Sequence, residues 1–291
     1  MNYNLSNGII EVEISSLGAE LLSLRRVSAP FDYLWHGDAA FWDRRSPVLF
    51  PICGTLWNNE ARFMGQTYSM TQHGFLRDME FQLIADEDRH MAFVARADEQ
   101  SKPRFPYDFE VQIDYTLLRG TLTVRWTVRN RGLMPMPFQI GAHPGFCYPK
   151  FKEADEVHGY LSFDVSSMLV STTLSGPFVT NGSFQVPLQP DGLLPLTNHT
   201  FDCDTIIDAS GQVHRITLHD KDCRPVVTLK HSMPVTALWS PRGGAAPFVC
   251  IEPWFGSPDT INFDDDFSRK PFVETLQSGR DWSTEYQIII E

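Results

Sequence analysis

The sequence predicts an all-β protein, built as a sandwich or barrel of antiparallel strands. Three observations support this prediction: apolar and polar residues alternate along many short segments, helical periodicity is scarce, and 20 prolines and 19 glycines punctuate the 291 residues. Alternation with a period of two is typical of a strand with one buried face. We expect one domain spanning residues 1–291, because single β-sandwiches and barrels often reach about 200–250 residues or more.

The clearest alternation lies in two neighbouring segments, residues 109–117 and 121–129. Apolar side chains occupy every second position in both, and Leu118, Arg119 and Gly120 supply a turn between them. These segments predict an antiparallel hairpin with one buried face. Shorter strands are expected, in chain order, at residues 8–14, 19–26, 79–85, 90–97, 158–165, 213–219, 225–231, 235–240 and 246–252.

Two segments depart from the strand pattern. Residues 38–44 are compatible with a single helical turn, for which Asp38 would be the N-terminal cap. The segment 171–204 is rich in Ser, Thr, Pro, Gly and Asn, which predicts a long surface excursion. Long loops on a rigid β scaffold commonly carry function.

Charge and cysteine content exclude several classes of protein. A formal net charge of −12 without a run of Lys or Arg predicts no binding to nucleic acid. The chain has neither a signal-like start nor an apolar segment near the roughly 18 residues of a membrane span, so we expect no membrane partner. Five cysteines without a C-x-x-C pair favour free thiols. We therefore expect a soluble, cytoplasmic protein.

Three stretches have an unusual composition for the ends of strands. They are TQHGFLRD (71–78), FQIGAHPGFCYP (138–149) and FVCIEPWFGSPD (248–259), and each combines an ionisable residue with Gly or Pro and aromatic residues. These stretches are the candidates for a functional site.

Strand alternation indicates how the ionisable residues of these stretches are oriented. In the second stretch it places His143 on one face with Gly141, which would leave open space beside the imidazole. In the third it places Glu252 on a partly apolar face with Cys250, where loss of hydration would raise the carboxyl pKa. Each of these residues also has a structural interpretation, as a histidine that holds a loop or as one partner of an ion pair. Composition and periodicity therefore do not define a reaction.

The combination of motifs resembles the aldose 1-epimerase family, the galactose mutarotases, and in particular its bacterial LacX-like branch. The resemblance is carried by YLWHGDAAFWDRRSPVLFPICG (33–54), QHGFLRD (72–78), IGAHPGF (140–146) and PFVCIEPWFGSPD (247–259). It implies a large antiparallel β-sandwich of the galactose mutarotase type, with a sugar-binding groove across a concave sheet.

The resemblance also implies roles for individual residues. Glu252 would take the proton from the anomeric hydroxyl of a sugar, and His143 would protonate the ring oxygen, so that the ring opens and recloses as the other anomer. His73 would bind and polarise the sugar near the ring oxygen. Asp204 would bind sugar hydroxyls, although Asp202 competes for that assignment.

This chemistry suits the residue types and needs little else. Exchange of anomers requires one base and one acid, for which a Glu with a raised pKa and a His titrating near neutrality are suitable. It requires no nucleophile, no redox cofactor and no metal, so the expected partner is a small sugar alone.

The substrate contacts are less uniform than the proton-transfer pair. LacX-like relatives usually carry Arg where this chain has Thr55, so a cationic contact is missing there. Arg77 follows the branch pattern and is the candidate to replace it. Trp254, Trp35 and Phe75 could stack on the apolar face of a sugar.

Three alternatives stay open at this point. A non-catalytic sugar-binding protein could use the same fold. A zinc hydrolase could use His73, His143 and Glu252 as ligands, since two His and one carboxylate form a known catalytic set. A hexose-6-phosphate 1-epimerase would need cations for the phosphate. Candidates for that role are Arg25, Arg26, Arg44, Arg45 and Arg77.

Overall fold

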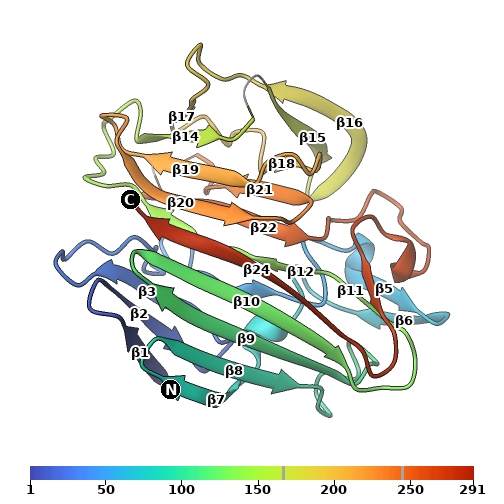
Figure 1. Ribbon diagram of the computed structural model, residues 1–291. Helices are drawn as coiled ribbons and strands as arrows, with labels where there is room; N and C mark the ends of the chain where they lie inside the picture. The colour runs from blue at the N-terminus through green and yellow to red at the C-terminus, as the bar shows by residue number, and fades with distance from the viewer. Residues whose placement is uncertain (166–167, 244–245) are drawn as a thin grey trace.

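A nine-stranded antiparallel sheet forms the larger layer of the computed structural model, which describes residues 1–165, 168–243 and 246–291 (Figure 1). From one edge to the other, its strands are β17 (Leu194–Leu196), β14 (Gly159–Phe163), β19 (Arg215–His219), β20 (Pro225–His231), β24 (Asp281–Ile290), β10 (Thr121–Asn130), β9 (Phe109–Leu118), β8 (His90–Arg96) and β7 (Gln82–Glu87). Strand β24 therefore joins two halves of the sheet that are distant in sequence.

A six-stranded sheet forms the second layer and carries the functional stretches of the sequence. Its strands are β18 (Ile206–Asp208), β21 (Val235–Trp239), β22 (Phe248–Phe255), β12 (Ile140–Ala142) and β4 (Val48–Leu49), with β13 (Gly145–Cys147) also paired to β22. Both sheets contribute to one continuous apolar core, so the two layers are packed on each other. The predicted all-β sandwich is thereby confirmed.

Shorter elements surround the two layers. They are a sheet of β1 (Asn2–Ser6), β2 (Ile10–Ser15) and β3 (Leu21–Arg26), the pairs β5 (Glu60–Phe63) with β6 (Gln66–Ser69), β11 (Met136–Phe138) with β23 (Glu274–Leu276) and β15 (Leu169–Ser175) with β16 (Phe178–Val186), and the 3-10 turns η1 (Trp57–Asn59), η2 (Leu76–Asp78) and η3 (Phe267–Arg269). Among the described residues, no helix is long and apolar enough to cross a membrane.

The two faces of β22 have different functions in the fold. Val249 and Ile251 point into the core between the sheets. Cys250, Glu252 and Trp254 alternate with them and lie on the opposite face. Although β22 is buried along almost its whole length, only its second face carries ionisable groups.

The predicted hairpin is confirmed as β9 and β10. Its register runs from Thr121 opposite Leu118 to Asn130 opposite Phe109, as the alternation requires. The nine shorter predicted strands all contain or overlap an observed strand. The segment predicted at 79–85 begins later, at Gln82: the turn η2 ends at Asp78, and Glu80 forms only an isolated bridge to Leu17 before β7 begins. The expected cap is also present, since Asp38 Oδ1 accepts a 2.9 Å hydrogen bond from the backbone N–H of Ala40.

The description of residues 171–204 as a surface excursion is only half right. Half of this segment is regular: β15 and β16 form a hairpin with a register shift near Thr172, and β17 is an edge strand of the large sheet. The hairpin is anchored to the body by a hydrogen bond from the N–H of Val179 to the carbonyl of Asp259, at 3.0 Å. Polar composition misled the prediction because both faces of much of this hairpin are exposed to solvent.

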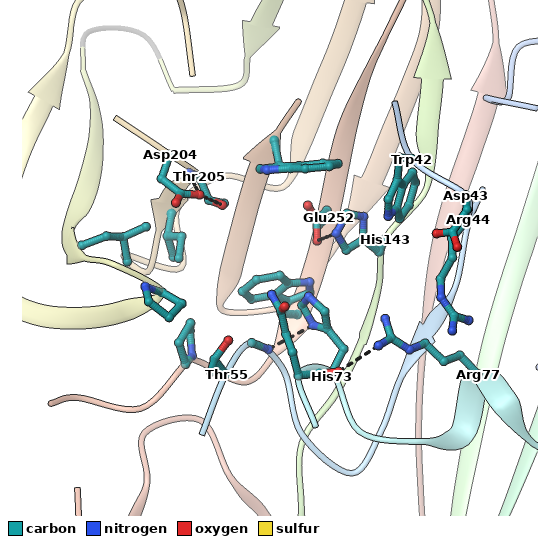
Figure 2. A pocket seen from close by; sticks show the side chains of 18 residues that line it. Trp42, Asp43, Arg44, Thr55, His73, Arg77, His143, Asp204, Thr205 and Glu252 are labelled. Carbon is teal, nitrogen blue, oxygen red and sulfur yellow. Dashed lines mark hydrogen bonds and ion pairs between the residues drawn. The ribbon is translucent and has the colours of Figure 1, made fainter. Parts of the chain in front are cut away.

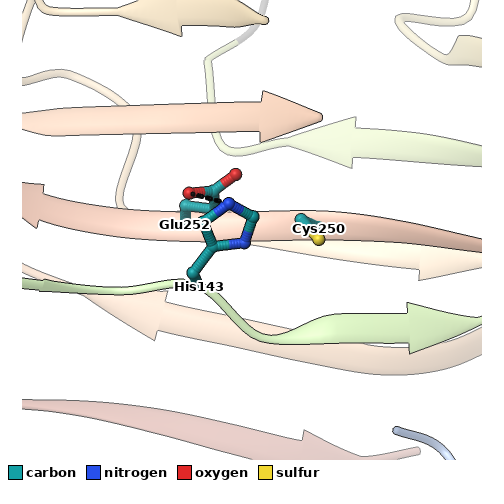
Figure 3. Close-up of side chains that lie close together, drawn as sticks. All are labelled: His143, Cys250 and Glu252. Carbon is teal, nitrogen blue, oxygen red and sulfur yellow. Dashed lines mark ion pairs between the residues drawn. The ribbon is translucent and has the colours of Figure 1, made fainter. Parts of the chain in front are cut away.

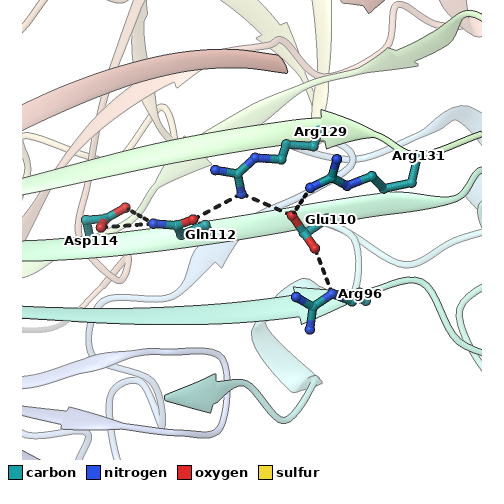
Figure 4. A network of polar contacts seen from close by, with 6 residues as sticks. All are labelled: Arg96, Glu110, Gln112, Asp114, Arg129 and Arg131. Atoms are coloured by element: carbon teal, nitrogen blue, oxygen red, sulfur yellow. Dashed lines mark hydrogen bonds and ion pairs between the residues drawn. The ribbon is translucent and has the colours of Figure 1, made fainter. Parts of the chain in front are cut away.

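The outer face of the large sheet carries a network of charged side chains (Figure 4). Glu110 is 6% exposed and is surrounded by Arg96 at 2.7 Å, Arg131 at 2.8 Å and Arg129 at 3.1 Å. Burial raises the pKa of Glu110, but the hydrogen bonds from Arg131 and Arg96 outweigh that effect and lower the pKa overall. This carboxyl is therefore held as a carboxylate that links three strands.

Candidate active site

The predicted functional residues gather in one pocket of about 540 Å³ on the second face of the six-stranded sheet (Figure 2). The pocket is lined by Trp42, Asp43, Arg44, Gly54, Thr55, Gln72, His73, Arg77, His143, Leu174, Pro177, Asp204, Thr205, Ile207, Trp239, Glu252, Trp254 and Pro258. These include the two residues expected to transfer protons, His143 and Glu252, and four of those expected to bind the sugar, His73, Arg77, Asp204 and Trp254.

Glu252 and His143 form the centre of the pocket. Glu252 comes from β22, and His143 follows directly after β12, where the neighbouring strand is interrupted by Pro144 before it resumes as β13. The backbone is still satisfied at this break, since Ile251 N–H donates to the carbonyl of Pro144 at 3.2 Å. The break turns the imidazole toward the carboxyl, and His143 Nε2 lies 3.3 Å from Glu252 Oε2.

Burial controls the protonation of this pair. It raises the pKa of Glu252 well above the ordinary carboxyl value. The indole N–H of Trp254 lies nearby and lowers this pKa to a smaller extent, although it forms no hydrogen bond with the carboxyl. Burial lowers the pKa of His143 to about 3, and the charge of Arg77 contributes to that decrease. The histidine therefore does not titrate near neutrality, which contradicts the expectation from the sequence. Burial therefore favours the uncharged form of each side chain, in which the carboxyl of Glu252 carries the one proton of the pair.

His73 is held as a neutral hydrogen-bond donor. Its Nδ1 accepts a 3.1 Å hydrogen bond from the backbone N–H of Gly54, so its ring proton is on Nε2. Burial lowers the pKa of His73 well below its ordinary value, and the neighbouring His143 and Arg77 act in the same direction. The ring lies edge-on to that of His143, with 5.4 Å between the centroids.

Two glycines permit close packing around these rings. A Cβ atom on Gly141 would lie 2.5 Å from Cδ1 of Trp254, so the space expected beside His143 is occupied by the indole. Gly54 has a φ of 77°, and a Cβ there would lie 2.4 Å from Cγ of Pro258. Both positions therefore require glycine for steric reasons, and Gly54 for its backbone conformation as well.

Two arginines line one end of the pocket. Arg77 donates a 2.9 Å hydrogen bond to the carbonyl of Gln72, while its buried Nε has no partner among the described residues. Burial, and then the neighbouring Arg44, lower the pKa of Arg77. Asp78 pairs with Arg44 at 2.7 Å, so it does not neutralise Arg77 directly. The other candidate cations have partners outside this pocket: Arg25 pairs with Glu11 and Asp32, while Arg26 and Arg45 donate to backbone carbonyls.

Asp204 and Thr205 lie on the opposite side of the central pair from these arginines (Figure 2). Asp204 accepts hydrogen bonds from the N–H of Thr205 at 2.8 Å and from Arg242 at 2.5 Å. Asp202 instead contacts the exposed His199 and does not line the pocket. Between the two acids that the sequence left open, Asp204 is the one in the site.

The aromatic wall differs from the one the sequence suggested. Trp254 lines the pocket, but Trp35 and Phe75 are wholly buried in the protein and do not. Trp42 and Trp239 take their place, and the ring centroid of Trp42 is 4.7 Å from that of His143. Trp239 could have been found from the sequence, since it lies on a predicted strand. Trp42 follows the turn capped by Asp38, whose position only the tertiary structure defines.

A buried ion pair supports the wall that contains Thr55 and Pro258. Lys270 Nζ is paired with the carboxylate of Asp259, and both side chains are almost completely inaccessible. Asp259 also accepts a 2.8 Å hydrogen bond from the N–H of Trp57 and donates its own N–H to the carbonyl of Thr55 at 2.9 Å. Removing one partner of such a pair would leave an uncompensated buried charge.

This sandwich, with an acid–base pair in a pocket of aromatic and polar side chains, is of the galactose mutarotase-like class. A galactose mutarotase-like protein from Lactobacillus casei has a TM-score of 0.93 at 29% identity, with 100% of both chains covered. A galactose mutarotase related enzyme from Lactobacillus acidophilus has a TM-score of 0.92 at 27% identity, covering 100% of this chain and 97% of the other.

The family itself is defined by sequence. The family model described as aldose 1-epimerase matches residues 1–288, so the chain belongs to the aldose 1-epimerase family. The chromosomal and plasmid LacX proteins of Lactococcus lactis are each 28% identical to this chain over 283 residues, which cover 94% of either chain. The resemblance seen in the motifs is confirmed.

We predict that Gly54→Ala destabilises the pocket wall more than Gly65→Ala does. Both glycines have similar positive φ values, 77° and 75°, but a Cβ on Gly65 would have nothing within 4 Å. Each variant should lose about 1–2 kcal/mol from backbone strain, and Gly54→Ala a further ~1–3 kcal/mol from overlap with Pro258. Urea unfolding of both variants measures the difference. Equal losses would show that the wall relaxes without cost.

Proposed function

We propose that this protein is an aldose 1-epimerase, which interconverts the α and β anomers of a hexose. The observation that carries the proposal is the Glu252–His143 pair, with 3.3 Å between Oε2 and Nε2, which is buried yet lines the pocket. Membership of the aldose 1-epimerase family supports the same reaction class. The partner is a small sugar, with neither nucleic acid nor membrane required.

The reaction begins with a proton transfer from the anomeric hydroxyl to Glu252. His143 supplies a proton to the ring oxygen, the bond between that oxygen and C1 breaks, and the open-chain aldehyde forms. The anomeric oxygen and the ring oxygen are both bonded to C1, so they can reach two side chains that are only 3.3 Å apart. Rotation about C1–C2 presents the other face of the aldehyde. Reclosure then returns each proton and yields the other anomer.

The shared proton of the pair suits this exchange. A carboxylic acid beside a neutral imidazole has the same number of protons as a carboxylate beside an imidazolium, so the reactive form arises by transfer within the pair. Burial opposes the charged form of both groups, so neither side chain is stabilised in its ionised state. The roles of acid and base are reversed during reclosure, so each turnover ends with the one proton that the pair held at the start.

The surrounding residues orient the sugar in this proposal. His73 donates its Nε2 proton to a sugar oxygen close to the reacting carbon. Asp204 accepts hydrogen bonds from hydroxyls at the far side, and Trp254 packs against an apolar face of the ring. A binding protein without catalysis would not need an acid and a base facing each other. A hydrolytic zinc site on His73 is disfavoured because Nδ1 accepts a hydrogen bond from Gly54, which leaves the ring proton on Nε2 and no free lone pair for a metal.

We predict that Glu252→Gln lowers kcat for anomer exchange by at least ~10²-fold without loss of fold, because the amide cannot accept the proton. His143→Asn should have a similar effect, and the double variant should be little worse than either, since both residues act in one transition state. Polarimetry or NMR with freshly dissolved α-glucose and α-galactose measures the rate.

Glu274→Gln is the matched control for this experiment. Glu274 is half-buried, burial also raises its pKa, and it does not line the pocket. Its removal should leave kcat within about twofold of the unmodified protein. The acid–base assignment is wrong if Glu252→Gln retains the kcat of the unmodified protein on a sugar that this protein turns over.

We predict that the pH dependence of kcat/KM shows no transition near pH 6.5, the ordinary pKa of histidine. The pair is active with one proton: it gains a second only at the lowered pKa of His143, about 3, and loses its last at the raised pKa of Glu252. The profile should therefore lack a histidine limb near neutrality, and activity should fall as the pH rises through the raised pKa of Glu252. The measurement uses chelator-treated protein, with the uncatalysed rate subtracted at each pH. An acid limb at about pH 6–7 would show that His143 titrates normally.

A second candidate function is the epimerisation of a phosphorylated hexose. The specific observation is the pair of guanidinium groups at one end of the pocket, where the buried Nε of Arg77 has no partner among the described residues. A phosphate could accept hydrogen bonds from Arg77 and Arg44 together. Thr55 adds no cation, so Arg44 and Arg77 are the two cationic side chains among the residues that line the pocket.

We predict that Arg77→Lys lowers kcat/KM by about 10-fold or more, with a larger decrease for glucose 6-phosphate than for glucose, if phosphate is bound there. Lysine keeps the charge but loses the planar set of donors. Arg45→Lys is the control, because Arg45 bonds the carbonyl of Leu22 outside the pocket. Unchanged kinetics with a lower melting temperature would show instead that Arg77 only clamps the loop through Gln72.

A further inference from the structure

A third side chain accompanies the Glu252–His143 pair and has no part in the proposed reaction. Cys250 lies two residues before Glu252 on the same face of β22, and one donor atom from each of Cys250, Glu252 and His143 lies within 4.8 Å of the other two. Figure 3 shows the imidazole between the carboxyl and the thiol. All three side chains are buried.

The donor set identifies the chemical class of ligand that fits. Thiolate, imidazole and carboxylate together are ligands of Zn²⁺ and of similar thiophilic divalent cations, whereas Mg²⁺ and Ca²⁺ prefer oxygen alone. Two donor atoms, His143 Nδ1 and Glu252 Oε2, are buried without a hydrogen-bond partner among the described residues. Buried nitrogen and oxygen atoms without a hydrogen-bond partner can use their lone pairs to coordinate a metal ion.

The geometry requires only a small adjustment. Ordinary Zn–S and Zn–N bond lengths at a tetrahedral angle place the two donor atoms about 3.5 Å apart. The three donor atoms already lie within 4.8 Å of one another, and each belongs to a side chain beside the break between β12 and β13. His143 and Glu252 line the pocket, so an entering cation would keep an open coordination position on the pocket side.

We propose that His143, Cys250 and Glu252 form a binding site for one thiophilic divalent cation such as Zn²⁺. The protein cannot epimerise sugars while this site is occupied. The cation coordinates the thiolate, the carboxylate and the imidazole, and both the thiol proton and the proton of the Glu252–His143 pair are released to solvent. Inhibition follows because coordination uses the lone pairs that would otherwise move protons. Only this inhibitory consequence rests on the proposed function. The binding site itself rests on the geometry of the three side chains.

Binding is tested with Co²⁺ and Zn²⁺ on the full chain after removal of adventitious metal. One equivalent of Co²⁺ should produce a thiolate-to-cobalt absorption band with intense tetrahedral visible bands, and Zn²⁺ should displace it. In Cys250→Ser the thiolate band should vanish and the dissociation constant for Zn²⁺ should rise at least ~10-fold. Cys53→Ser is the matched control, because Cys53 is an equally buried thiol beside Gly141 but outside the donor group.

Each binding outcome decides the proposal. A thiolate band that is retained in Cys53→Ser and lost in Cys250→Ser supports the site. Absence of a stoichiometric thiolate band, or equal affinity in Cys250→Ser, would overturn it. Circular dichroism and melting temperature of the metal-free variants show whether the chain is folded, and Cys250→Ala provides a second substitution if the serine variant is not.

The inhibitory consequence is tested separately by activity. Zn²⁺ should abolish anomer exchange at one equivalent, a chelator should restore it, and the midpoint of inhibition should rise at least ~10-fold in Cys250→Ser relative to that variant without metal. Activation by Zn²⁺ would contradict the proposed inhibition and favour metal-assisted chemistry. If the metal-free protein has no epimerase activity, the proposed function fails while the cobalt spectrum still decides whether the site exists.

Discussion

The burial of one carboxyl group, Glu252, is the constraint on which the candidate site depends. Glu110 provides a comparison within the same chain, since both carboxyls are less than 10% exposed. Three arginines surround Glu110 and its pKa falls, whereas Glu252 faces an imidazole and an indole and its pKa rises. The first arrangement fixes a charge and joins strands. The second opposes ionisation of the carboxyl, and perturbed pKa values of this kind are concentrated at functional sites.

The rest of the pocket follows from where this carboxyl sits. Glu252 lies on a central strand, so its position is defined by backbone pairing on both sides, with Ala237 on one side and the interrupted strand containing His143 on the other. The groups proposed to contact substrate, such as Arg77 and Asp204, come instead from turns and loops. Such a division keeps the proton-transfer groups rigid while allowing the substrate contacts to differ between relatives.

The sequence predicts the strands well because one-sided burial imposes a period of two. The motifs of the family also contain His73, His143 and Glu252, which the structure brings into one pocket. Three features lay beyond what the sequence predicts. The packing of Trp254 against Gly141 depends on a contact between strands, so no local pattern reports it. Trp35 and Trp42 differ in exposure although both belong to one motif, because only the tertiary structure decides which ring faces the pocket. The lowered pKa of His143 depends on burial by residues from several segments.

The position of β24 affects how the chain can fold during synthesis. Strand β24 pairs with β10 on one side and β20 on the other, yet it is synthesised after both of them. Until β24 leaves the ribosome, β10 and β20 each present an unpaired edge beside an apolar surface. Such edges are templates for association with other chains. Nascent chains of this protein should therefore depend on chaperones until the central strand joins the two halves of the sheet.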